Sequence, residues 1–144
     1  MEEHRQRLSR AFEEIAPGKR YVYRRTFTDG DVSMFCGVTG DLNPYHQDDL
    51  FAASTPFGRR IIPGLLTGSM LTHIGGLLGF LATEMHFEFL AGVHVGDTVT
   101  CTVTFSSRDE ERGRLTGEAV YVNQDGRDVL RARFSGFPGQ VRLA

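Results

Sequence analysis

The stretch from Ile61 to Ala82 contains no Asp, Glu, Lys or Arg, and this constrains the fold more than any other feature. It is long enough to cross a membrane as a helix. It is also interrupted by Pro63 and by five glycines, and it contains polar residues such as His73. These residues make it a poor candidate for an isolated membrane-spanning helix. A helix without a charged face is otherwise a core helix. We therefore expect a buried helix with protein on all sides, and no membrane association.

Small residues recur along this predicted helix at spacings of three and four. They are Gly64, Gly68, Thr72, Gly75 or Gly76, and Gly79. Such a stripe allows a backbone or a ligand to approach closely. Proline suits the first helical turn, where its missing N–H is not needed, so Pro63 is expected there. The amide of Gly64 would then point out of the helix N-terminus, where it could stabilise a developing oxyanion.

The segments around this helix alternate apolar and polar residues, which predicts half-buried antiparallel strands. One strand is expected early, at 21–27, and four later, at 84–89, 98–105, 115–122 and 130–134. Residues 123–126, Asn-Gln-Asp-Gly, are typical of a hairpin turn between the last two strands. Thr28 and Asp31 form a capping-box pattern that begins a short helix. Residues 1–18 are expected to include an N-terminal amphipathic helix, with Leu8, Phe12 and Ile15 at helical spacing.

Length and charge narrow the class of protein. A chain of 144 residues with no repeat and no linker is expected to form a single domain over 1–144. Its formal charge of −2 gives no electrostatic footprint for nucleic acid. Cys36 and Cys101 lack a metal-ligand spacing and lie in apolar patterns, so free buried thiols are expected. The charged residues 1–7 do not resemble a secretory signal, and a cytoplasmic protein is expected.

Residues 40–46, Gly-Asp-Leu-Asn-Pro-Tyr-His, place a carboxylate and an imidazole in one bent loop. Pro44 forces Asn43 out of helical geometry, so the chain turns between Asp41 and His46 and could aim both side chains at one point. Such a pair can hold and activate one water. The alternative is that these residues only form a turn and a helix cap, which is common for Asp and Asn.

The wider neighbourhood resembles the type-2, (R)-specific enoyl-CoA hydratases of the MaoC-like family. The family signature, Asp-x-Asn-Pro-x-His followed by a buried helix that begins with glycine, matches residues 41–46 and 64 onward, and residues 88–98 look like the family's next strand and turn. The resemblance implies an α+β hotdog fold, an antiparallel sheet wrapped around a long central helix, and a homodimer. One departure is Pro63, where many members have histidine.

The resemblance implies hydration of a trans-2-enoyl thioester, carried by CoA or by an acyl-carrier protein, without a cofactor or metal. Asp41 and His46 would hold the attacking water, and the Gly64 amide would bind the thioester oxygen. Asn43 is expected to fix the loop and Leu65 to contact the substrate. Arg59 and Arg60 are candidates for the CoA phosphates, or an ordinary solvated pair.

Two other functions remain open at this point. A hotdog thioesterase would use a carboxylate to direct water at the carbonyl carbon of the same substrate, and a non-catalytic acyl-CoA-binding subunit would lack chemistry. Among the other histidines, we expect His73 to be buried and bonded to a carbonyl, with a catalytic role as the alternative, and we expect His86 and His94 to lie on the surface. No metal, nucleotide-phosphate or serine-hydrolase motif occurs.

Overall fold

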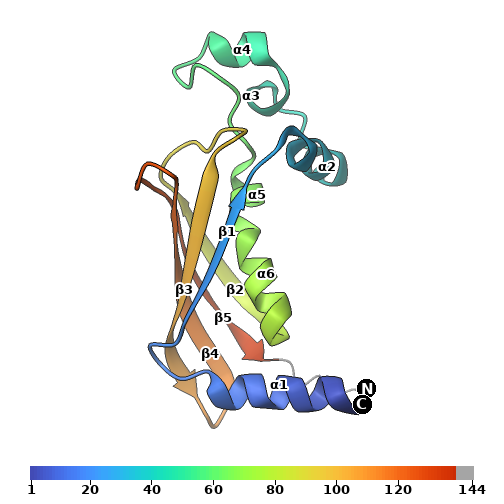
Figure 1. The fold of residues 1–144 in the computed structure, drawn as a ribbon, viewed down its shortest axis with the longest axis vertical. Helices are drawn as coiled ribbons and strands as arrows, with labels where there is room; N and C mark the ends of the chain where they lie inside the picture. Colours follow the sequence, from blue (N-terminus) through green and yellow to red (C-terminus); the bar gives the residue numbers. More distant parts are fainter. Residues whose placement is uncertain (139–144) are drawn as a thin grey trace.

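The structure is a computed structural model that describes residues 1–138, except for the side chains of residues 4, 7–9, 11, 12 and 138. Figure 1 shows the arrangement of its elements. In chain order they are α1 (Glu2–Glu14), β1 (Arg20–Thr26), α2 (Asp29–Thr39), α3 (Pro44–Gln47), α4 (Asp49–Ala53), α5 (Gly64–Gly68), α6 (Met70–Leu78), β2 (Phe80–Phe89), β3 (Thr98–Asp109), β4 (Arg114–Val122) and β5 (Asp128–Pro138).

The five strands form one antiparallel sheet in the order β1-β3-β4-β5-β2. The predicted strands are therefore confirmed. Alternation fixes which face is buried: Val99, Cys101, Val103 and Phe105 of β3 all point into the core. The turn between β4 and β5 also forms as predicted. Asn123 Oδ1 accepts backbone N–H bonds from Asp125 and Arg127, both at 3.0 Å, and Gly126 takes the left-handed conformation with φ 77°.

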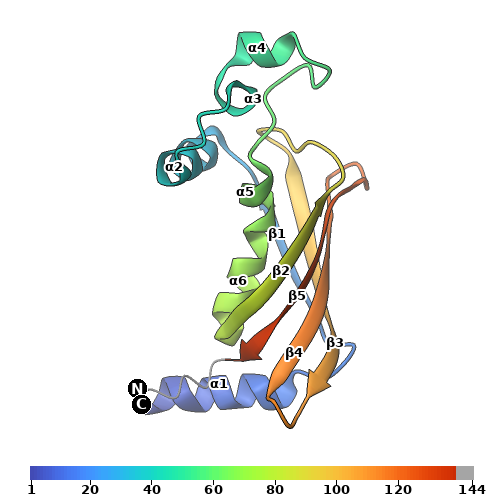
Figure 2. The same ribbon diagram turned by 180° about the vertical axis from the view of Figure 1, so that it is seen from behind.

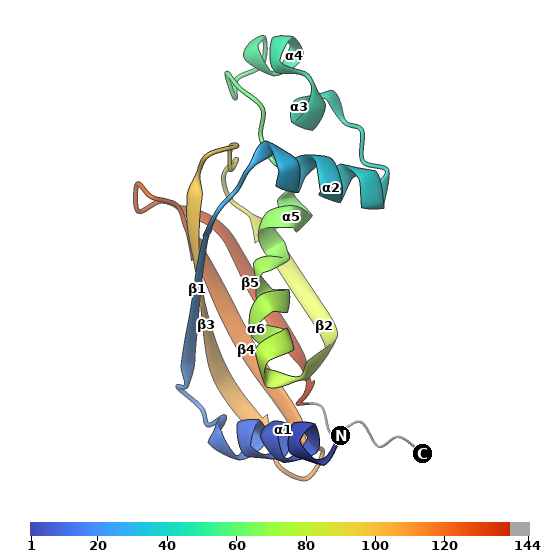
Figure 3. The same cartoon turned by 45° about the vertical axis from the view of Figure 1, so that its right-hand side comes forward.

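The central helix lies along the inner face of the sheet, between β1 and β2 (Figure 3). Its predicted bounds were too long. It begins at Gly64, is interrupted at Ser69 and ends at Leu78, because Gly79 adopts φ 60° and the chain continues directly into β2. The helix is also not covered on every side, since Leu65 and Leu77 are 57% and 61% exposed. The expectation of protein on all sides is thus wrong for a single chain.

The first two glycines of the predicted stripe, Gly64 and Gly68, face aromatic rings of β2. A Cβ atom added at Gly64 would lie 2.6 Å from the ring of Phe89, and one added at Gly68 would lie 3.1 Å from the ring of Phe87. Glycine therefore allows α5 to approach this strand closely. Strand β2 lies at the edge of the sheet, next to the helix (Figure 2), and Met85 and Phe89 are 45% and 56% exposed, more than the predicted half-buried pattern implied.

The hydrophobic core fills the space between α5, α6 and the inner face of the sheet. The side chain of Tyr121 extends from β4 through this core to α5, where its hydroxyl donates a 2.9 Å hydrogen bond to the carbonyl of Gly68. Cys36 and Cys101 are buried and free, as predicted. Burial raises the pKa of the Cys101 thiol to about 12, which makes it unreactive near neutral pH.

Helices α2, α3 and α4 gather beyond one end of the sheet, and α1 lies across the other end (Figure 1). The start of α2 is fixed by the predicted capping box between Thr28 and Asp31. The predicted N-terminal helix is present as α1, and Ile15 just after it is fully buried, whereas the side chains of Leu8 and Phe12 lie outside the described residues. None of the helices among residues 1–138 is both long and apolar enough to cross a membrane.

Candidate active site

The loop between α2 and α3 bends as its sequence predicts. Gly40 ends α2 in the left-handed conformation with φ 72°, and Asn43 begins α3, where its side-chain oxygen accepts the backbone N–H of Tyr45 at 3.2 Å. The backbone N–H of Asn43 donates to Asp41 Oδ1 at 3.3 Å. Asn43 therefore caps α3 with its side chain, and its backbone N–H holds the carboxylate of Asp41.

His46 is held in one orientation. The side chain is almost entirely buried, and Nδ1 lies 2.7 Å from the carbonyl oxygen of Ile61. Because a carbonyl oxygen only accepts hydrogen bonds, the proton belongs on Nδ1. In the neutral ring this leaves the lone pair of Nε2 facing Asp41 Oδ2 at 3.6 Å.

Two hydrogen-bond acceptors that face one another need a donor between them. The 3.6 Å between His46 Nε2 and Asp41 Oδ2 is longer than a direct hydrogen bond. A water molecule can donate one proton to each acceptor, which leaves an oxygen lone pair directed away from both. The geometry is thus suited to holding a nucleophilic water.

Asp41 and His46 open into a cavity of about 620 Å³, the size of a pocket for a small ligand. Gly64 and Leu65 line the same cavity, so four of the seven predicted site residues meet there. Most of the wall is apolar, with side chains from α2, from the segment between α4 and α5, from the end of β2 and the loop after it, and from the start of β5: Phe35, Phe57, Ile61, Ile62, Phe89, Leu90, Ala91, Val93, Val129 and Leu130. Asn43, Arg59 and Arg60 lie outside the lining.

The amide of Gly64 stands at the first position of α5. Pro63 is the residue before the helix, with φ −55° and ψ 134°, and not part of its first turn as predicted. The N–H of Gly64 has no hydrogen-bond partner among the described residues. The chain just before this position is held in place, because the carbonyls of Arg60 and Ile61 accept from the rings of His94 and His46. The amide is therefore free for a ligand and rigidly placed.

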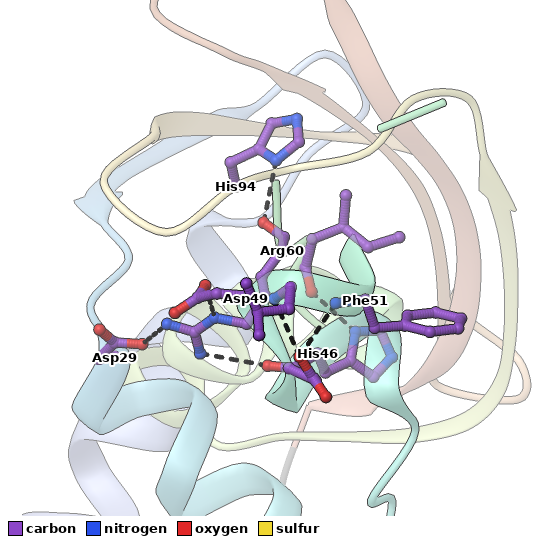
Figure 4. Close-up of polar contacts among 9 residues, drawn as sticks. Asp29, His46, Asp49, Phe51, Arg60 and His94 are labelled. Atoms are coloured by element: carbon purple, nitrogen blue, oxygen red, sulfur yellow. Dashed lines mark hydrogen bonds and ion pairs between the residues drawn. The ribbon is translucent and has the colours of Figure 1, made fainter. Parts of the chain in front are cut away.

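Arg60 links helices α2, α3 and α4 around this site through hydrogen bonds (Figure 4). Its guanidinium binds Asp29 at 2.7 Å, Asp49 at 2.6 Å and the carbonyl of His46 at 3.3 Å. It thus joins the starts of α2 and α4 to the histidine, although it was predicted as a phosphate ligand or a solvated residue. The side chain of Arg59 is 61% exposed, and among the described residues its one ion pair is with Asp97, at 3.5 Å. These positions favour Arg59 over Arg60 for binding phosphate.

Two of the three predictions for the other histidines are corrected. His94 is half-buried, and its Nδ1 donates to the carbonyl of Arg60 at 2.9 Å, so it belongs to the support of the site rather than to the surface (Figure 4). His73 is exposed and stacks on Tyr23 with ring centroids 3.9 Å apart, so it is not a buried, carbonyl-bonded residue. His86 is exposed beside Glu88, as expected.

The sequence model of the MaoC-like domain matches residues 12–126, which is more than half of the chain. The chain belongs to the MaoC-like domain family. The resemblance seen in the Asp-x-Asn-Pro-x-His loop is thereby confirmed.

Named relatives agree with this assignment. An (R)-specific enoyl-CoA hydratase of Rhodospirillum rubrum is 31% identical over 73% of this chain and 76% of its own length. A 3-hydroxybutyryl-CoA dehydratase of Methylorubrum extorquens is 34% identical over 72% of this chain and 68% of its own. Both are hydro-lyases, and the enzyme class predicted from the sequence is confirmed.

The fold is confirmed by a solved structure, the (R)-hydratase of Aeromonas caviae that is involved in PHA biosynthesis. It superposes with a TM-score of 0.84 at 26% identity, covering 88% of this chain and 99% of that one. The five-stranded antiparallel sheet around a central helix is therefore the hotdog fold.

Proposed function

We propose that this MaoC-like protein hydrates trans-2-enoyl-CoA to (R)-3-hydroxyacyl-CoA. The observation that carries the proposal is the pair of acceptors, Asp41 Oδ2 and His46 Nε2, 3.6 Å apart at the wall of a largely apolar cavity. A free backbone N–H, that of Gly64, lines the same cavity. Hydration of a conjugated thioester needs these two parts: a positioned water for Cβ and a donor for the thioester oxygen.

The reaction follows from this arrangement. Asp41 removes a proton from the water as its oxygen bonds to Cβ, and the electrons of the C=C bond move to give an enolate. The Gly64 N–H stabilises the negative charge on the thioester oxygen of that enolate. This oxygen carries more negative charge in the enolate than in the substrate, so the hydrogen bond is stronger in the enolate. Cα then takes a proton at the Asp41–His46 pair, which completes the addition of one water. The apolar wall holds the acyl group and limits other water near the reacting carbons.

Arg59 is the candidate ligand for the CoA phosphates. We expect Arg59→Ala to raise the KM for crotonyl-CoA about fivefold, since an exposed ion pair contributes up to ~1 kcal/mol. The effect should shrink at high salt because the contact is exposed. The KM for crotonyl-N-acetylcysteamine, which lacks the nucleotide, should not change. An equal rise for both substrates would contradict a phosphate contact.

Arg60→Ala is the matched comparison. Because Arg60 holds Asp29, Asp49 and the carbonyl of His46, its loss should lower the melting temperature and reduce kcat for both thioesters. Thermal unfolding and kinetics on the same preparation separate the two arginines. A specific rise in KM for the CoA ester alone would reassign the phosphate contact to Arg60.

We infer that two copies of the chain form a homodimer. The exposed apolar residues of edge strand β2 and of the helix beside it, which include Leu77, Leu81 and Met85, support this. A stable interface would bury at least ~1,000 Å². Sedimentation at micromolar concentration should give the mass of a dimer, and a monomer alone would remove the inference. A cytoplasmic location stays a prediction from the sequence.

The decisive experiment for the function uses crotonyl-CoA. Hydration removes the conjugated enoyl absorbance and adds the mass of one water while the thioester stays intact. A thioesterase would instead release free CoA, and an acyl-CoA-binding subunit would bind without turnover. Loss of absorbance without release of CoA supports the proposal, and either of the other outcomes overturns it.

A further inference from the structure

Thr67 carries a buried hydroxyl that nothing in the described structure satisfies. The residue is 2% exposed, and its Oγ1 atom is buried without a hydrogen-bond partner. Buried polar groups in proteins nearly always have a partner, so an orphan calls for an explanation such as a bound ligand. Thr67 also lines the cavity that contains Asp41 and His46.

The neighbouring hydroxyls of the same helical segment do not share this property. Ser69 Oγ donates to the carbonyl of Leu66, and Thr72 Oγ1 donates to the carbonyl of Ser69, both at 2.6 Å. Bonds of this kind, to a carbonyl of the preceding turn, are usual for Ser and Thr in helices. Thr67 has carbonyls in the preceding turn as well, yet its hydroxyl bonds to none of them. The hydroxyl therefore keeps its hydrogen-bonding capacity for a group that the described residues do not supply.

The position of Thr67 on α5 indicates what it would contact. It follows Gly64 by three residues, a spacing that places two residues side by side on one face of a helix. Side chains in a helix lean toward its N-terminus, which directs that of Thr67 back toward the Gly64 amide. Asp41 and His46, between which the attacking water would lie, line the same cavity.

We propose that the Thr67 hydroxyl is a second donor to the thioester oxygen, beside the N–H of Gly64. Two donors would stabilise the enolate better than one, and the acyl thioester would supply the acceptor that the buried hydroxyl lacks. This rests on the proposed function in one respect, that the ligand of the cavity is an acyl thioester.

Thr67→Val tests the proposal because valine has the same shape without the hydroxyl. We expect kcat for crotonyl-CoA to fall by ~10²-fold, at the lower end of the loss for an oxyanion-hole donor. The melting temperature should stay equal or rise, because the variant removes an unpaired buried polar group. Thr67→Ser should keep most of the activity. Thr102→Val is the control, since Thr102 lies on the outer face of the sheet, between buried Cys101 and Val103.

A second measurement reads the contact directly. Butyryl-CoA labelled with ¹³C at the thioester carbonyl cannot be hydrated, and its bound C=O stretch falls in frequency with each hydrogen bond to the oxygen. We expect a higher frequency in Thr67→Val than in wild type, Thr67→Ser and Thr102→Val. If Thr67→Val does not fold, Thr67→Ala is measured in the same way.

Each outcome supports or overturns the role of Thr67 or the proposed function. Unchanged kcat in folded Thr67→Val overturns the proposal, and so does a loss of kcat with an unchanged C=O frequency, which would place the hydroxyl elsewhere. If wild-type protein binds butyryl-CoA but fails to hydrate crotonyl-CoA, the proposed function is wrong, while the infrared comparison still tests the contact of Thr67. Absence of thioester binding to wild type would remove both.

Discussion

Asp41→Asn should lower kcat for crotonyl-CoA hydration by ~10²-fold or more, with little change in the melting temperature. A positioned acid or base typically contributes on this scale. Asparagine has the shape of aspartate and can still accept the backbone N–H of Asn43, so the loop should persist. The side chain of Asp41 is 42% exposed, so the substitution buries no unpaired group. Kinetics and thermal unfolding on the same preparation check both halves of this prediction.

Two variants of His46 separate its chemistry from its packing. His46→Asn keeps a donor near the position of Nδ1, and so can bind the carbonyl of Ile61. His46→Gln reaches toward Asp41 but leaves that buried carbonyl without its donor, which costs about 1–3 kcal/mol. Both should lose kcat by ~10²-fold or more, and only His46→Gln should lose stability.

The double variant Asp41→Asn/His46→Asn should be scarcely slower than either single variant. Residues that hold one water act as a unit, and their losses do not add. If the pair merely forms a turn, the opposite is expected: reduced stability and unchanged activity per folded molecule. That result would return Asp41 and His46 to the role of cap and turn residues.

Gly64→Pro should abolish measurable hydration, because it deletes the N–H proposed to bind the thioester oxygen. Loss of one such donor reduces kcat by ~10²–10³-fold. Proline is tolerated at the first position of a helix, and the ψ of 134° at Pro63 suits a residue that precedes proline. Activity at the wild-type rate in folded Gly64→Pro would exclude the amide from the mechanism.

Gly64→Ala is the control that this position requires. Any Cβ at residue 64 meets the ring of Phe89 at 2.6 Å, so proline changes the packing as well as the amide. Alanine causes the same displacement of Phe89 and keeps the N–H. The difference in kcat between the two variants therefore reports the amide, and equal activities would show that the loss comes from packing.

Local signals in the sequence predicted what depends on neighbouring residues. The capping box of Thr28 and Asp31, the turn at Asn123–Gly126 and the bend between Asp41 and His46 each depend on a few adjacent side chains, and each forms as expected. The uncharged stretch from Ile61 to Ala82 predicted the central helix because its residues are also adjacent in the sequence. Its ends were less well predicted, because Gly79 ends the helix by taking φ 60° whereas Gly75 and Gly76 remain helical.

Contacts between segments that are distant in the sequence could not be predicted from it. Arg60 binds Asp29, which lies 31 positions away, and His94 binds the carbonyl of Arg60 across 34 positions. No periodicity or motif marks such pairs, which exist only once α2, α4 and the loop before β3 have packed. The orphan hydroxyl of Thr67 is similar: an isolated threonine in an apolar helix gives no sign of whether it finds a partner.

The measurement that tests the central claim most directly is the product formed from crotonyl-CoA by wild-type protein and by Asp41→Asn, identified by mass and by chiral chromatography. The account predicts (R)-3-hydroxybutyryl-CoA from wild type, with the thioester intact, and the same product at least ~10²-fold more slowly from the variant. Release of free CoA, formation of the (S) product, or equal rates for the two proteins would contradict it.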